Sequence, residues 1–311
     1  MPHTVASQLA LAVALSVGAS CASHAPRGRV PTGPASRAAD AAMLLVPAGD
    51  YIAGSTRDER ERAYADYLAA AGDDPRHRRK AEDDLGPTAD HARAGRWFDR
   101  EAPRHHASLA AFLLDTTPVT NAAYAEFVRA TGRVAPAIDE PTWRAQQFVQ
   151  PYALEVARFN WTGAVPPAAR AQHPVVLVTH ADAADYCAWR GRRLPTAADL
   201  EKAMRGTDGL TYPWGNAWDP TRTNGAHRSR DTTPVGQYPD GAAPWGHLDL
   251  AGNVFHWTST PWPARPGSYT LKGSAWDDHA GVGRGAQRHG RPGTSRHAII
   301  GFRCAADAAA P

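Results

Sequence analysis

Short apolar runs separated by long polar stretches rich in glycine and proline dominate this sequence. The runs at 43–46, 112–115 and 174–178 are too short for core helices and are bounded by turn-forming residues. Each run therefore predicts a short strand.

Helical composition occurs at two places between these runs. At 57–70 the residues favour a helix, and Tyr64 and Leu68 stand four apart on what would be its inner face. At 121–130 the apolar residues again recur at helical spacing. We therefore expect one helix in each segment, followed after 130 by a loop-rich region.

Two further helices are predicted by capping boxes. Thr179 is followed three residues later by Asp182, and Thr196 is followed in the same way by Asp199. In such a pair each side chain satisfies a backbone N–H at the start of a helix. From residue 206 onward the pattern predicts irregular structure with short strands.

Composition agrees with a loop-rich domain rather than a bundle or a doubly wound sheet. The 311 residues are 43% hydrophobic and include 26 prolines, 27 glycines and ten tryptophans. This is enough apolar material for one sizeable core, and we expect a single α+β domain over 43–307. The net charge is +3, with basic residues scattered rather than striped, which excludes nucleic acid or a basic membrane-binding face as the expected partner.

The N-terminus predicts export. An apolar run at 9–17 is followed by small residues and then Cys21, so residues 1–21 are interpreted as a signal peptide. Small residues directly before a cysteine are typical of bacterial lipoprotein signals, in which Cys21 would be lipidated. The alternative is simple cleavage near Cys21. Residues 22–42 bury almost nothing and predict a disordered linker. The protein is therefore expected in the periplasm or at the cell surface, touching a membrane only through such a lipid.

The region from 186 to 304 holds seven blocks of rare residues in a fixed order. They are 186–189 (Tyr-Cys-Ala-Trp), 191–196 (Gly-Arg-Arg-Leu-Pro-Thr), 212–216 (Tyr-Pro-Trp-Gly-Asn), 233–236 (Thr-Pro-Val-Gly), 251–254 (Ala-Gly-Asn-Val), 272–276 (Lys-Gly-Ser-Ala-Trp) and 301–304 (Gly-Phe-Arg-Cys). Together these blocks resemble the formylglycine-generating enzyme family, also called sulfatase-modifying factors. The resemblance implies an irregular, loop-rich α+β fold related to C-type lectins. It also implies a structural disulfide between Cys187 and Cys304, and leftover cysteines in an exported chain generally pair.

The family's oxidases hold Cu(I) with two cysteines that follow a Gly-Gly-Ser-aromatic turn. In the corresponding segment of this chain, 273–288, no cysteine occurs. An asparagine that precedes Gly-Phe-Arg in the oxidases is replaced by Ile299, and only Arg288 matches among their functional residues. Because Cu(I) selects thiolates, we do not expect copper-dependent formylglycine formation here.

Calcium is a second metal that the resemblance raises, in a structural role. One family site would use Asn253 and the carbonyl of Val254, but its glutamate position is His256, and imidazole is a poor calcium ligand. A second site would use Asn224. The alternative for Asn253 is a turn residue that fixes its loop.

Iron is not expected. The sulfoxide synthases of ergothioneine synthesis share the fold, but their iron ligands come largely from a helical domain that this chain lacks. The sequence does hold two His-x-Asp pairs, His180/Asp182 and His247/Asp249, a spacing found in iron sites. Such pairs also arise by chance in a chain with 14 histidines.

The family's substrate groove is lined by the segment that contains Trp276, Asp277, Asp278, His279 and Arg288. These five residues are the candidate ligand-binding site. If the protein is an enzyme, the catalytic candidates are Asp278, His279 and Arg288, because a histidine beside carboxylates can act as an acid–base pair. The alternative is that the two aspartates are solvated turn residues and that Arg288 pairs with a buried acid such as Asp277.

Three functions remain open at this stage. The leading hypothesis is an exported protein of this fold, without the copper pair, that binds a peptide, protein or small ligand in the ancestral groove. The second is a metal-dependent oxidoreductase acting on an exported substrate, of the formylglycine-generating or pyoverdine-maturation type. The third is a lectin-like module that binds cell-envelope material.

Overall fold

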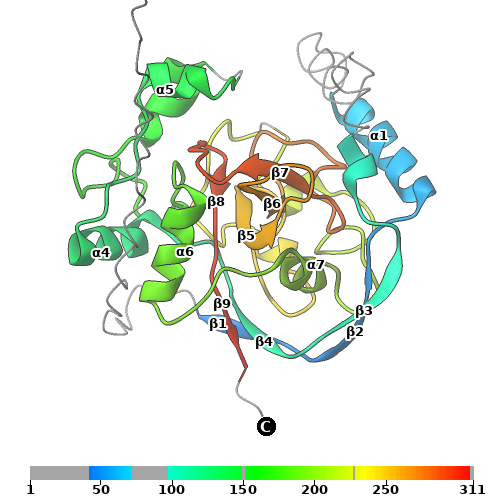
Figure 1. Ribbon diagram of the computed structural model, residues 1–311. Coiled ribbons are helices and arrows are strands. Elements are labelled where there is room, and N and C mark those ends of the chain that lie inside the picture. The colour runs from blue at the N-terminus through cyan, green and yellow to red at the C-terminus, as the bar shows by residue number, and fades with distance from the viewer. Residues whose placement is uncertain (1–41, 72–96, 149–150, 227, 309–311) are drawn as a thin grey trace, which may run out of the picture.

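The computed structural model describes residues 42–71, 97–148, 151–226 and 228–308 (Figure 1). The helices are α1 (Arg57–Ala71), α4 (Asn121–Thr131), α5 (Glu140–Ala145), α6 (His180–Trp189) and α7 (Ala197–Arg205). Short helical turns are η1 (Trp97–Arg100), η2 (Tyr152–Val156), η3 (Ala157–Phe159), η4 (Pro220–Arg222) and η5 (Pro239–Gly241). The strands are β1 (Met43–Val46), β2 (Gly49–Ala53), β3 (His105–Leu109), β4 (Phe112–Asp115), β5 (Phe255–Pro261), β6 (Ser268–Lys272), β7 (His289–Pro292), β8 (Ile300–Gly301) and β9 (Ala305–Asp307).

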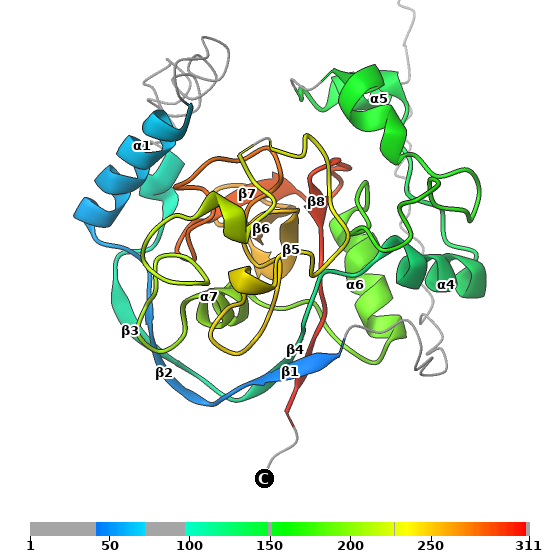
Figure 2. The same cartoon turned by 180° about the vertical axis from the view of Figure 1, so that it is seen from behind.

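Three small sheets organise these elements. The four-stranded sheet β7-β6-β5-β8 is antiparallel except for its β5–β8 pair. The second sheet is antiparallel, in the order β1-β4-β9, and β2 and β3 form a ribbon of their own. Figures 1 and 2 show the four-stranded sheet at the centre, with α4, α5 and α6 to one side and α1 on the other. Few residues lie in regular elements, so loops cover much of this frame.

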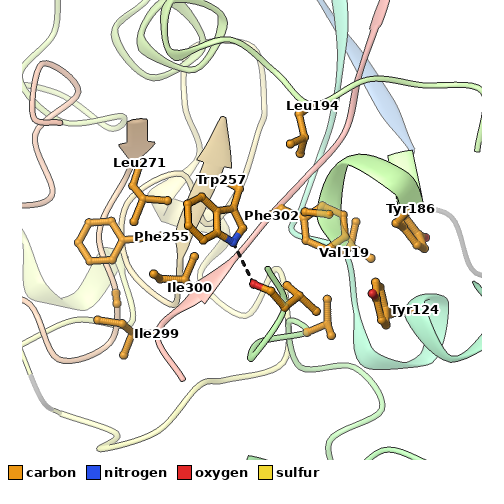
Figure 3. Packing of buried hydrophobic residues seen from close by; sticks show 14 of the residues in the cluster. Val119, Tyr124, Tyr186, Leu194, Phe255, Trp257, Leu271, Ile299, Ile300 and Phe302 are labelled. Atoms are coloured by element: carbon orange, nitrogen blue, oxygen red, sulfur yellow. Dashed lines mark hydrogen bonds between the residues drawn. The ribbon is translucent and has the colours of Figure 1, made fainter. Parts of the chain in front are cut away.

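The main core lies between the central sheet and helices α4 and α6. Trp257 on β5 and Phe302 are fully buried, and the ring of Tyr186 on α6 lies 5.4 Å from that of Phe302. Figure 3 shows Trp257 among these side chains, with its indole nitrogen donating to the carbonyl of Val178 at 3.0 Å. Each large apolar side chain buried in this way contributes roughly 1.5–3 kcal/mol.

Most local predictions are confirmed. Strands occupy 43–46 and 112–115, and helices occupy 57–71 and 121–131. Both capping boxes are present, with Thr179 and Thr196 accepting from the third helical N–H and the aspartates returning the bond. The expected α+β, loop-rich architecture is therefore confirmed.

Two details of the sequence interpretation are wrong. Residues 174–178 are buried but form no strand, because only Pro174 bridges Thr120 and Leu177 adopts a positive φ of 59°. On α1, Leu68 is 42% exposed. The inner face of that helix is instead made by Tyr64 and Tyr67, which are both buried.

The Cys187–Cys304 disulfide is confirmed, and it joins α6 to the segment before β9. The signal-peptide and linker predictions, with Cys21, fall on residues outside the described ones, apart from Ala42. No helix among the described residues has the length and apolar character needed to cross a bilayer.

Removal of the disulfide should destabilise the protein strongly. The two cysteines are 117 residues apart, and closing a loop of that length is worth roughly 4–5 kcal/mol in the chain-entropy account. Denaturant unfolding should show a loss near this value for Cys187→Ala, and Cys187→Ala/Cys304→Ala should lose about as much, because either change breaks the same bond. Peptide mapping of the unreduced protein by mass spectrometry checks the link itself. Free thiols at both positions in protein from an oxidising compartment would refute it.

Candidate functional site

The segment 273–288 connects β6 to β7 and is almost entirely buried. Trp276, Asp277 and His279 are only 2%, 4% and 6% exposed. The segment starts at Gly273, whose φ is +84°, and a Cβ there would lie 2.7 Å from the carbonyl oxygen of Leu250. Only glycine fits this close approach in a left-handed conformation.

Hydrogen bonds hold the first turn of this segment in one conformation. The hydroxyl of Ser274 accepts from the Gly252 N–H at 2.7 Å, and the Trp276 N–H donates to the Asn253 carbonyl at 3.2 Å. Asp278 accepts from the Ala275 N–H at 2.7 Å through its carboxylate. Asp278 therefore closes the turn, which is the structural alternative that the sequence left open for it.

The candidate site residues contact different neighbours. Trp276 lies under the guanidinium of Arg158, with the Arg158 Cζ 5.8 Å from a ring centroid. The His279 ring meets the edge of Tyr67 at 5.5 Å. Arg288 forms no hydrogen bond or ion pair with Asp277, Asp278 or His279. The structure therefore does not join Arg288 to the 276–279 turn by direct polar contact.

Arg288 belongs to a separate half-buried cluster of cationic and aromatic side chains. Its Nε donates to the carbonyl of Arg100 at 2.8 Å, and its Cζ lies 5.8 Å from the ring of Trp262. The Cζ of Arg100 lies 5.3 Å from the ring of Trp97. Within the part of the chain that the structure describes, no carboxylate forms an ion pair with Arg288, so the expected alternative of an Asp277 pair is not seen there.

Buried ion pairs anchor the rest of the segment. Arg284 makes two hydrogen bonds to the carboxylate of Glu101, at 2.8 and 3.1 Å. Lys272 donates to Glu201 at 3.2 Å and to the carbonyl of Gly285. Burial lowers the pKa of Lys272 and the Glu201 charge opposes that shift. Because Glu101, Arg284 and Lys272 are buried and Glu201 is nearly so, removing one partner would leave an uncompensated charge, which gives these residues a structural role.

The proposed calcium ligands are occupied by protein donors. Asn253, with φ of +67°, accepts from the Thr233 N–H at 3.0 Å and donates to its carbonyl at 3.2 Å. The side-chain oxygen of Asn224 accepts from Ser229 at 2.7 Å, and Val254 is fully buried. Asn253 thus acts as a turn residue, and calcium at either asparagine stays a prediction. Across the described ranges, no three His, Cys, Asp or Glu side chains lie close enough to share a metal ion.

The two His-x-Asp pairs also have structural contacts. The His180 ring stacks on Tyr269 at 3.4 Å, while Asp182 closes the capping box of α6. Asp249 accepts from the Gly236 N–H at 2.7 Å, and His247 is fully buried. Burial lowers the pKa of both His180 and His247 to about 4.

His256 and His289 are the most deeply buried imidazoles of the central sheet. Burial holds the pKa of each well below 6.5, and Arg303 acts in the same direction at His256, as Arg291 does at His289. The His289 ring lies 5.1 Å from Trp97 and 4.6 Å from Phe255. Both histidines are therefore neutral core residues in the folded protein.

One surface feature was missed by the sequence interpretation. A hollow lies between α5 and residues 291–296, and its walls include Arg265, Arg291 and Arg296. The sequence places α5 and 291–296 about 150 positions apart, and no spacing connects them. The only available signal was the number of arginines near the C-terminus. Their number alone does not predict where their side chains lie in the fold.

Comparison with known proteins gives a family match over most of the chain. Residues 31–308 match the family described as the sulfatase-modifying factor enzyme 1-like domain. A formylglycine-generating enzyme of Mycobacterium tuberculosis is 37% identical over 208 residues, which cover 53% of this chain and 69% of that protein. The mouse protein named inactive C-alpha-formylglycine-generating enzyme 2 is 35% identical over 248 residues, covering 68% of this chain and 80% of its own length.

Solved structures agree on the fold. PvdO from Pseudomonas aeruginosa superposes with a TM-score of 0.58 at 20% identity, over 86% of this chain and 94% of that one. CarF gives a TM-score of 0.56 at 16% identity, over 87% and 99% of the two chains. At these identities the similarity establishes the sulfatase-modifying factor fold and nothing about activity.

The buried histidines should make the protein sensitive to acid. Their folded pKa values lie below the unfolded value, so the unfolded chain binds more protons, and stability is lost as the pH falls below 6.5. Each such group contributes about 1.4 kcal/mol per pH unit. His289→Phe keeps an aromatic ring beside Trp97 and should reduce the slope of unfolding free energy between pH 6.5 and 5 by about one such contribution.

The matched control for this change is His106→Phe, at an exposed position of β3. It should leave the slope unchanged. Chemical denaturation at a series of pH values measures both variants. An unaltered slope for His289→Phe would show that His289 is protonated, or absent from the core, in the folded protein.

Proposed function

Because this chain belongs to the sulfatase-modifying factor family, we propose that it is a member without the copper oxidase activity. In this proposal it is exported and binds a peptide, protein or small ligand at the surface around Arg288. The oxidase alternative is then an outcome that the first experiment below distinguishes from it, and the lectin-like module is a third candidate.

The observation that supports this proposal is the state of the cysteines. The chain has three, of which Cys187 and Cys304 are joined to each other, and the segment 273–288 contains none. A Cu(I) site requires soft ligands, above all thiolates. The disulfide removes the two cysteines of the folded domain from that role, and Cys21 lies far away in sequence, within the predicted signal. The mouse relative named as inactive is consistent with loss of the oxidase activity within this family.

The contacts of Arg288 favour binding over catalysis. One nitrogen of its guanidinium is used by the Arg100 carbonyl, and no carboxylate of the described residues pairs with the others. A guanidinium presents a planar fork that can engage a ligand carboxylate through two parallel hydrogen bonds. Trp262, which is half-buried, supplies an apolar wall beside it, and Trp97 packs on the neighbouring Arg100. Catalytic candidates Asp278 and His279 lie in the buried turn, without direct polar contact to this fork.

The absence of oxidase activity is directly testable. The protein with its disulfide intact and loaded with Cu(I) should not convert a Cys-x-Pro-x-Arg peptide to the formylglycine form, because the segment 273–288 offers no thiolate pair to hold the metal. Mass spectrometry of the peptide detects the change, with an active formylglycine-generating enzyme as the positive control. Aldehyde above the level of a protein-free control would refute the proposal.

Arg288→Lys separates a binding role from a structural one. Lysine keeps the charge but cannot form the two parallel hydrogen bonds, so binding of short peptides with a free carboxyl terminus should weaken by roughly 1–3 kcal/mol. Tryptophan fluorescence reports binding, because Trp262 and Trp97 lie in the cluster. The melting temperature should change little, and amide-capped peptides should bind weakly to both proteins. A destabilised variant with unchanged affinity would exclude Arg288 from the binding site.

A further inference from the structure

The hollow beside α5 has a wall of basic side chains and no acidic one. It has a volume of ≈650 Å³, and among the described residues its lining includes three arginines but neither aspartate nor glutamate. The arginines come from three places in the fold: Arg265 from the β5–β6 connection, Arg291 from β7 and Arg296 from the following loop. These three charges surround the same hollow only in the folded protein.

Arg296 is held firmly in place. Its guanidinium donates to the Leu177 carbonyl at 2.6 Å and lies 2.8 Å from a carboxylate oxygen of Asp182. Its backbone is clamped by Gln146, whose side chain accepts from the Arg296 N–H at 3.0 Å and donates to its carbonyl at 3.5 Å. Asp182 also pairs with Arg133 at 2.8 Å. Arg133 also pairs with Asp185, so two carboxylates balance these two arginines, and the positive charge that a ligand would meet in the hollow comes from Arg265 and Arg291.

An aromatic floor positions the second arginine. The Cζ of Arg291 lies 5.5 Å from the ring of Phe148. Phe148 packs in turn on Trp143, at 4.8 Å, and on His297, at 4.1 Å. Since Trp143 is 1% exposed, this floor is part of the core. Ser295, also in the lining, is buried and brings a hydroxyl group to the same wall.

We propose that this hollow binds a small organic anion through a carboxylate, sulfate or phosphate group. Arginine forks match the geometry of these oxyanions, and the volume lies in the range of ordinary small-molecule sites. Phe148 offers an apolar surface to the body of the ligand, while Arg265 and Arg291 face its charged group. The site is distinct from the cluster around Arg288, where the guanidinium packs on Trp262 instead.

Three small aromatic anions test the proposal on the full chain: benzoate, phenyl sulfate and phenyl phosphate, each titrated calorimetrically at constant ionic strength. At least one should bind saturably, and the one that binds best identifies the oxyanion class. Arg291→Gln and Arg265→Gln should each raise its Kd about fivefold or more, because each removes a charge-assisted hydrogen bond. Arg296→Gln is not used, since its contacts with Leu177 and Asp182 make it important for folding.

Two control variants make the result specific. Arg144→Gln removes one positive charge from the exposed side of α5, where Arg144 pairs with Glu140, and it should change the Kd less than about twofold. Arg222→Gln removes a positive charge at another surface ion pair, with Asp219, and it should likewise change the Kd less than about twofold. Absence of saturable binding by all three anions, or an equal loss in Arg144→Gln, would overturn the proposal. An unchanged Kd in both Arg291→Gln and Arg265→Gln would place the anion outside the hollow and would overturn it as well.

Discussion

A single buried guanidinium holds the framework together. Arg303 has no exposed surface, and it donates to four carbonyls: those of Asp115 at 2.9 Å, Thr116 at 3.1 Å, Leu248 at 2.7 Å and Asp249 at 2.9 Å. Burial lowers its pKa to about 10, so the group is still charged at neutral pH. A charge without solvent must be satisfied by fixed dipoles, and here those dipoles come from the end of β4 and from a loop over 130 residues later.

The residues on either side of Arg303 in the sequence also fix this part of the fold. Phe302 enters the main core and Cys304 closes the disulfide to Cys187. The carboxylate of Asp115 accepts from the Cys304 N–H at 2.8 Å and from Arg192 at 2.7 Å, while burial raises its pKa to about 6. Three consecutive residues thus connect β4, α6 and the central sheet. This junction fixes the ends of the loops that connect these elements. The loops themselves can therefore be long and irregular.

The sequence predicted the features that depend on residues close together in the chain. It also predicted those that the family resemblance implies. Thr179 and Thr196 cap helices because their bonding partners stand three residues away, and the disulfide followed from the family resemblance. Residues 174–178 were misassigned because an apolar run signals burial, which they have, but not the positive φ of Leu177. The sequence was also insufficient to predict how the candidate site residues are arranged. Asp278 and His279 have residue types suited to acid–base chemistry, yet only tertiary contacts reveal that Asp278 closes a buried turn.

The arginines of this fold differ in how their charges are satisfied inside the domain and at its periphery. Inside the domain, Arg205, Arg284 and Arg303 donate to buried carbonyls and carboxylates. These groups have little further capacity for a ligand, because breaking them would expose buried charge to an apolar interior. At the periphery, Arg288 has no carboxylate partner among the described residues. A ligand carboxylate bound through its remaining N–H groups would disturb none of the bonds that maintain the frame. The interior arginines can therefore stay fixed while peripheral ones change partner, which separates stability from recognition within one small domain.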